Sequence, residues 1–63
     1  MEEWQTRVKV EKEKLMAKLD RLIIFIESNE FKNINYKNQN LLRRQRLIME
    51  LYDDVLRERI EEF

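Results

Sequence analysis

The stretch NEFKNINYKNQN, residues 29–40, decides how this 63-residue chain folds. It is rich in asparagine, which tolerates turn conformations and competes for backbone hydrogen bonds, so the stretch predicts a turn. The chain on both sides consists largely of strong helix formers, and the whole sequence contains no glycine or proline. We therefore expect an all-α fold, an antiparallel two-helix hairpin that makes a single domain of residues 1–63.

The expected hairpin has a first helix over about residues 2–28, a turn over about 29–35 and a second helix over about 36–62. Asn35 directly precedes the second helix and is of a type that caps helix N-termini. Phe31 lies within the turn, where an apolar ring can close the end of the hairpin.

Apolar residues in both predicted helices recur at spacings of three and four, as in helices that pack along one face. In the first helix this inner stripe is Trp4, Val8, Leu15, Leu19, Leu22 and Ile26. In the second it is Leu42, Gln45, Met49, Tyr52, Leu56, Arg59 and Phe63, flanked by a row of Leu41, Ile48 and Val55. Polar side chains on an inner stripe need partners, and Glu11 is at the matching height for Arg59, so we expect an ion pair there. Tyr52 is expected in the core with its hydroxyl at an edge.

The apolar surface is wider than two helices can cover. Ile23, Ile24 and Phe25 surround the first helix, while Leu47 and Leu51 lie off the inner stripe of the second. Chains of this size usually need disulfides, a metal or association to be stable, and this one has no Cys or His. We therefore expect the hairpin to assemble into a homo-oligomeric helical bundle.

Composition argues against catalysis, and we expect neither an enzyme nor a cofactor. Without His or Cys, the chain lacks the usual zinc ligands, proton shuttle and thiol nucleophile. Asp53 and Asp54 are adjacent, so on a helix they point about 100° apart and cannot act as a paired dyad. Pairing of these carboxylates with Arg57 is the simpler expectation.

Partners and location follow from charge and hydropathy. The thirteen basic and thirteen acidic residues balance, which does not favour DNA or a membrane as a partner. The longest apolar run, Leu22 to Ile26, is too short to cross a bilayer or to form a signal peptide, so we expect an intracellular protein.

Two groups of residues are candidates for binding. Trp4 and Arg7 lie three apart, and an indole beside a guanidinium can stack a base and hold a phosphate. The alternative is that Trp4 caps the open end of the hairpin against Ile60 and Phe63. Arg43 and Arg46 share a helical face in the densest basic patch, suited to phosphate, although a solvated face or ion pairs with another protomer would also explain them.

These residues together form a pattern that resembles a known family. The pattern is Glu3-Trp4-Gln5, Arg7-Val8, Glu11, Leu15, Leu19, Leu22, Phe25-Ile26 and Phe31, then Leu41-Leu42, Gln45, Met49, Tyr52, Leu56, Arg59-Ile60 and Phe63. It resembles the short helical-hairpin domain of phage-encoded cyclic-nucleotide sponges, the anti-CBASS and Thoeris anti-defence proteins. The resemblance covers essentially the whole chain.

The resemblance implies a phage protein that acts in the host cytoplasm and evades immunity by sequestering cyclic oligonucleotide signals without hydrolysing them. The signals would be cyclic dinucleotides such as cyclic GMP-AMP, or cyclic trinucleotides. It implies a homohexamer with pockets between protomers. On this chain Trp4 would stack a base, Arg7 would contact a phosphate or base edge, and Tyr52 and Arg59 would support the pocket.

Two other functions fit the residues. A structural hairpin that recruits or assembles another protein would use the excess apolar surface. A small nucleic-acid-binding regulator would use Arg43, Arg44 and Arg46, but the neutral net charge argues against it.

Overall fold

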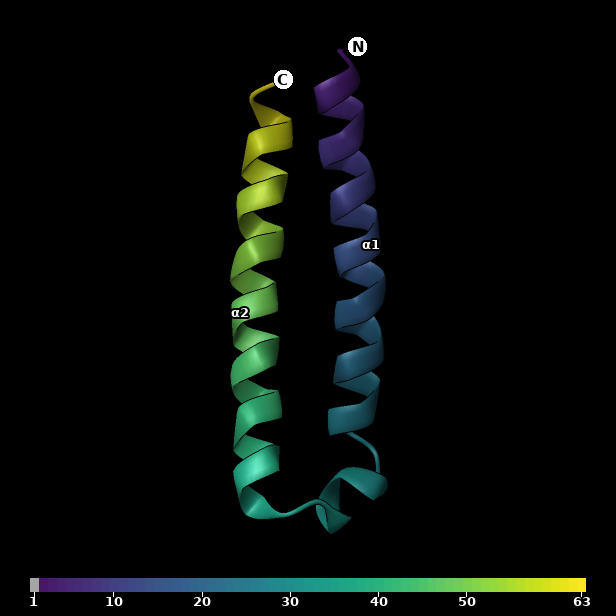
Figure 1. Ribbon diagram of the computed structural model, residues 1–63, viewed down its shortest axis with the longest axis vertical. Coiled ribbons are helices and arrows are strands. Elements are labelled where there is room, and N and C mark those ends of the chain that lie inside the picture. Colours follow the sequence, from purple (N-terminus) through teal and green to yellow (C-terminus); the bar gives the residue numbers. More distant parts are fainter. Residues whose placement is uncertain (1) are drawn as a thin grey trace.

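The computed structural model describes residues 2–63, which form two long antiparallel helices joined by a short helical turn (Figure 1). Helix α1 spans Glu3–Ile26, the 3-10 helix η1 spans Glu30–Asn33, and helix α2 spans Tyr36–Glu61. These residues contain no strand. The all-α class is thus confirmed, whereas the oligomeric bundle stays a prediction.

The helix ends differ from expectation in detail. Helix α1 stops two residues earlier than predicted, because the Ser28 hydroxyl and backbone N–H both donate to the Phe25 carbonyl, at 2.6 and 3.0 Å. The predicted irregular turn contains the helical segment η1, which buries Phe31. Asn35 caps α2 as expected, its side chain accepting from the Asn38 N–H at 2.9 Å.

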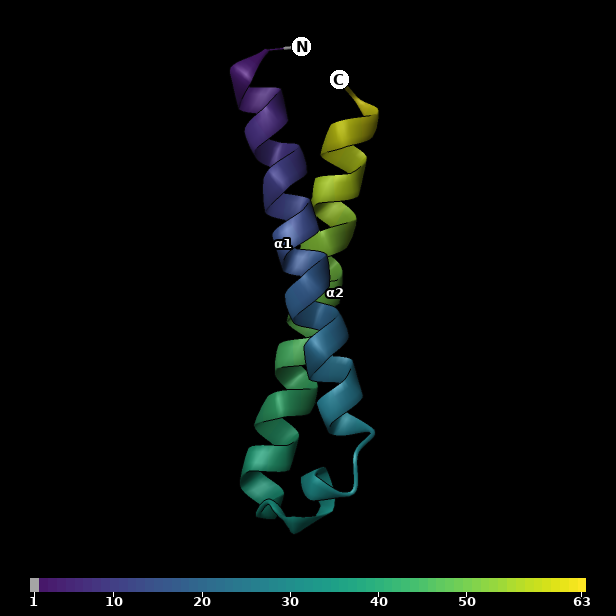
Figure 2. The same cartoon turned by 90° about the vertical axis from the view of Figure 1, so that its right-hand side faces the viewer.

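The molecule is a thin rod of 46 × 14 × 13 Å, with both described chain ends together at one end (Figure 2). Two helices side by side enclose little space, so only a narrow seam is buried. Its buried residues are Val8, Leu15, Leu19, Phe31 and Leu56, with Met49 and Ile60 packed against them. No helix within residues 2–63 is long and apolar enough to cross a membrane.

Part of the predicted inner stripe of α2 is confirmed, because Leu42, Met49 and Leu56 are partly or fully buried, whereas the positions between them are displaced by one residue. Gln45, Tyr52 and Arg59 are exposed, and their expected inward positions are wrong. Their C-terminal neighbours Arg46, Asp53 and Ile60 take the inner, partly buried positions instead. The shift at these three positions follows from the side chains available, because it covers Ile60 in place of Arg59 and gives Asp53 a cation across the seam.

Candidate ligand-binding site

One ion pair sets the register between the helices around the candidate site. Lys12 Nζ lies 3.0 Å from Asp53 Oδ1, and both side chains are about four-fifths buried, being 18% and 20% exposed. This pair takes the place of the predicted Glu11–Arg59 pair, which is not among the ion pairs within residues 2–63. It brings the first turns of α1 beside the last turns of α2.

Trp4 packs at the open end of the rod. Its ring meets that of Phe63 edge to face, with centroids 5.0 Å apart and planes at 81°. This contact corresponds to the packing alternative foreseen for Trp4. The side chain is nonetheless 48% exposed, so part of the indole faces solvent and is accessible to a planar group.

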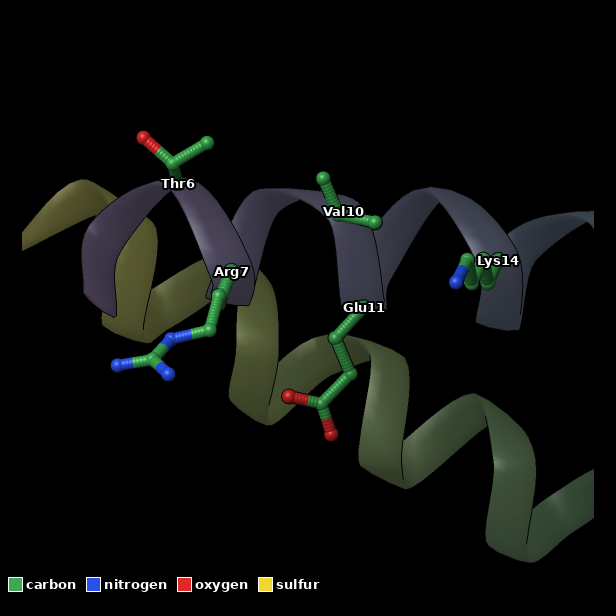
Figure 3. Close-up of a pocket in the computed structure, with 5 residues that line it drawn as sticks. All are labelled: Thr6, Arg7, Val10, Glu11 and Lys14. Atoms are coloured by element: carbon green, nitrogen blue, oxygen red, sulfur yellow. The ribbon is translucent and has the colours of Figure 1, made fainter. Parts of the chain in front are cut away.

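A shallow groove of about 400 Å³ follows the outer side of α1 from this end (Figure 3). Its walls are Thr6, Arg7, Val10, Glu11 and Lys14. Arg7 and Glu11 point to the side on which α2 lies, whereas Thr6 and Val10 point away from it. All five residues belong to one helix, so the groove is open and a ligand in it would need a second surface to be enclosed.

Arg59 and Tyr52 both lie on the exposed surface of α2. The register places Arg59 level with Arg7, since one is six residues beyond Asp53 and the other five before Lys12. Tyr52 is two helical turns nearer the turn end and is 42% exposed. The Arg7 and Arg59 positions are therefore at one level along the rod, about one helical turn from the half-exposed Trp4.

Arg43 and Arg46 are not part of this set. The Arg43 guanidinium lies 5.1 Å from the centroid of Phe31, at the turn end, which is a cation–π geometry. Arg46 Nε lies 3.5 Å from Glu50 Oε1. Arg46 is thirteen residues from Arg59, which separates the two by about 20 Å along the helix. The six predicted residues therefore do not converge on one pocket within a single chain.

The acidic residues near the C-terminal end of α2 form ion pairs with two different basic residues. The Asp54 carboxylate accepts a hydrogen bond from Arg57 at 3.4 Å, and Arg57 also reaches Glu61 at 3.4 Å. The hydrogen bond to Asp54, together with the Glu61 charge, raises the pKa of Arg57 further above its usual range. The expected Asp54–Arg57 pair is confirmed, whereas Asp53 pairs with Lys12 instead.

A second groove, of about 310 Å³, lies on α2 and was not predicted. It is lined by Leu41, Arg44, Gln45, Ile48 and Met49. The sequence signal for it is the spacing of four of these residues, at i, i+3, i+4 and i+7, which surrounds a single depression on a helix surface.

Comparisons with known proteins give two matches. The model of a family described as Sequestin matches residues 2–62. The chain is also 38% identical over 60 residues to the uncharacterized 7.5 kDa protein in the denB-rIIB intergenic region of Enterobacteria phage T4, across 95% of this chain and 94% of that protein. No solved structure matches the chain.

Proposed function

This chain belongs to the Sequestin family, and from that premise we propose that it sequesters cyclic nucleotide immune signals without hydrolysing them. The family name denotes sequestration, and the relative in phage T4 is a protein of similar length. The expected class of signal is the cyclic oligonucleotides, such as cyclic GMP-AMP. Such a protein would act in the cytoplasm of the infected host, where the signal is made.

The observation that carries this proposal is that Arg7 and Arg59 lie at one level along the rod, about one helical turn from the half-exposed Trp4 at its open end. Planar guanidinium groups bind phosphate oxygens through two parallel hydrogen bonds. An exposed indole offers a face on which a base can stack, which contributes about 1–3 kcal/mol per base. A cyclic oligonucleotide carries both kinds of group, with two or more bases and two or more phosphates.

Enclosure of the ligand is proposed to come from a second protomer. The α1 groove that contains Arg7 is walled by a single helix, whereas binding pockets usually bury most of the ligand surface. Assembly into a homohexamer, as the family resemblance implies, would place another chain against this groove. Sequestration then works by mass action, because a dissociation constant far below the signal concentration leaves little free messenger.

The test is a thermal-shift and calorimetric screen of the full chain with chemically defined ligands. One arm contains cyclic di- and trinucleotides, in which phosphodiesters link nucleosides. A second contains cyclic mononucleotide derivatives with a pyrophosphate, and a third contains linear dinucleotides. We expect tight binding in a cyclic arm and recovery of the intact ligand after the protein is heat-denatured.

Matched variants locate the site. Arg7→Ala and Arg59→Ala should each weaken binding about tenfold to a hundredfold, the usual range for a lost charge-assisted contact. Arg21→Ala removes an exposed arginine fourteen residues from Arg7 and should leave binding unchanged. Absence of binding in every arm would overturn the proposal.

A second candidate function rests on the exposed apolar residues of α2. Ile48 and Leu51 are each about two-thirds exposed, as expected if α2 binds another protein. In that case the chain is a structural or adaptor hairpin, and it would bind a protein partner while no nucleotide changes its melting temperature.

A further inference from the structure

Helix α2 carries a second regular stripe, here called the outer stripe, on a side that does not face α1. Its residues recur at alternating spacings of four and three: Lys37, Leu41, Arg44, Ile48, Leu51, Val55, Glu58 and Glu62. All eight are exposed, and the four apolar ones are between 46% and 66% exposed. This spacing is the repeat by which one helix packs along another.

The charges of the outer stripe are separated along the helix. Its N-terminal part is basic, its centre is apolar and its C-terminal part is acidic. None of its four charged residues belongs to an ion pair within residues 2–63. Charged residues on neighbouring sides of α2 do pair within the chain, as Arg46 does with Glu50 and Arg57 with Asp54.

We propose that the outer stripe binds the outer stripe of a second copy of this chain, antiparallel and about a two-fold axis. The alignment is centred when the midpoints of the two stripes, between Ile48 and Leu51, lie opposite each other. In this centred alignment Lys37 faces Glu62 of the second copy, and Ile48 faces its Leu51. Arg44 then comes within one turn of Glu58 of the second copy. A parallel pairing would instead oppose base to base and acid to acid, which is unfavourable.

The unpredicted groove on α2 supports the same alignment. Leu41, Arg44, Gln45 and Ile48 surround a depression of the kind that receives one side chain of a facing helix. The centred antiparallel alignment puts Val55 of the second copy at this level. By symmetry the groove of the second copy receives Val55 of the first.

Two further exposed apolar side chains flank the stripe. Leu47 is 61% exposed and Tyr52 is 42% exposed, and they lie on opposite sides of it. About the two-fold axis, the two Leu47 side chains lie on one edge of the interface and the two Tyr52 side chains on the other, where each loses part of its solvent contact. The product is a four-helix assembly with the two α2 helices at its centre and one α1 on either side, and three such pairs would make the proposed hexamer. This inference does not depend on which ligand is bound.

The mass of the full chain in solution, by sedimentation velocity over a concentration series, tests the interface. The wild type is expected at twice the 8.0 kDa chain mass or an even multiple of it. Lys37→Glu with Arg44→Glu makes the charged ends of the stripe uniformly acidic and should weaken association about tenfold or more. A control, Lys18→Glu with Lys32→Glu, changes net charge equally at exposed positions off the stripe and should associate like the wild type.

Rescue separates a lost interface from a lost fold. Glu58→Lys with Glu62→Lys makes the stripe ends uniformly basic and should also weaken self-association. Mixing the acidic-stripe and basic-stripe variants should restore the pair, as should combining all four changes in one chain. A monomeric wild type, an acidic-stripe variant that associates normally, or failure of both rescues would overturn the proposal.

Orientation has its own test, since the chain contains no cysteine. Under mild oxidation, a mixture of Lys37→Cys and Glu62→Cys chains should form mainly the mixed disulfide if the helices are antiparallel. A predominance of disulfides between identical variants would indicate parallel packing and would contradict the alignment.

Discussion

At the scale of single residues, stability depends on a few side chains in the seam between the helices. Leu56 is the most buried of them, at 1% exposed, and it lies in the cluster with Val8 and Leu15. A chain with so small a core has few other contacts to compensate for a lost side chain.

Leu56→Ala should therefore lower the free energy of unfolding by about 2–4 kcal/mol, from lost transfer energy and the cavity left behind. Urea denaturation followed by circular dichroism measures the change. Ile24→Ala, at a position 70% exposed, should change stability by less than about 0.5 kcal/mol. Equal effects at the two positions would show that the seam between α1 and α2 is not the core.

The Lys12–Asp53 pair is the second residue-scale feature with a measurable effect. Because both side chains are mostly buried and their atoms are 3.0 Å apart, a double-mutant cycle with Lys12→Ala and Asp53→Ala should give a favourable coupling of about 0.5–1 kcal/mol. The same cycle on the more exposed Arg46–Glu50 pair, 3.5 Å apart, should give a smaller value. Zero coupling between Lys12 and Asp53 would contradict the register.

At the scale of elements, local signals were sufficient for the helices and insufficient for part of the inner face of α2. The asparagine-rich turn and the Asn35 cap were predictable, because capping and turn chemistry depend on neighbours in sequence. The inner row of Leu42, Met49 and Leu56 was predictable from its apolar spacing, whereas the inner positions between its members were not. Placing Asp53 inside in preference to Tyr52 required knowing that Lys12 reaches Asp53 across the seam, which no local pattern contains.

The cap of α2 gives an element-scale prediction. Asn35→Ala removes the acceptor for the Asn38 N–H and should cost about 1 kcal/mol of stability. Asn35→Asp keeps an acceptor and adds a favourable charge at the helix N-terminus, so it should preserve stability or raise it slightly. Thermal melts at one fixed protein concentration measure both. Equal destabilisation by the two substitutions would argue against a capping role.

At the scale of the whole molecule, the rod is too thin to bury its own apolar residues, and its stability should depend on association. If folded chains pair through the outer stripe, the melting temperature must rise with protein concentration, because mass action favours the paired state. Melts between micromolar and hundred-micromolar protein test this. The melting temperature of the acidic-stripe variant should depend less on protein concentration. A wild-type melting temperature that does not change with concentration would count against coupled folding and pairing.

The position of the two described chain ends has a practical consequence for work on this protein. Both lie at one tip of the rod (Figure 1), where the ring of Phe63 contacts Trp4 and Arg7 follows within one turn of α1. A purification tag, fluorophore or surface anchor attached to either terminus would therefore stand over the proposed binding groove. The η1 turn at the opposite tip, around Lys32, is the better attachment point, so immobilised assays are best anchored there through a single introduced thiol.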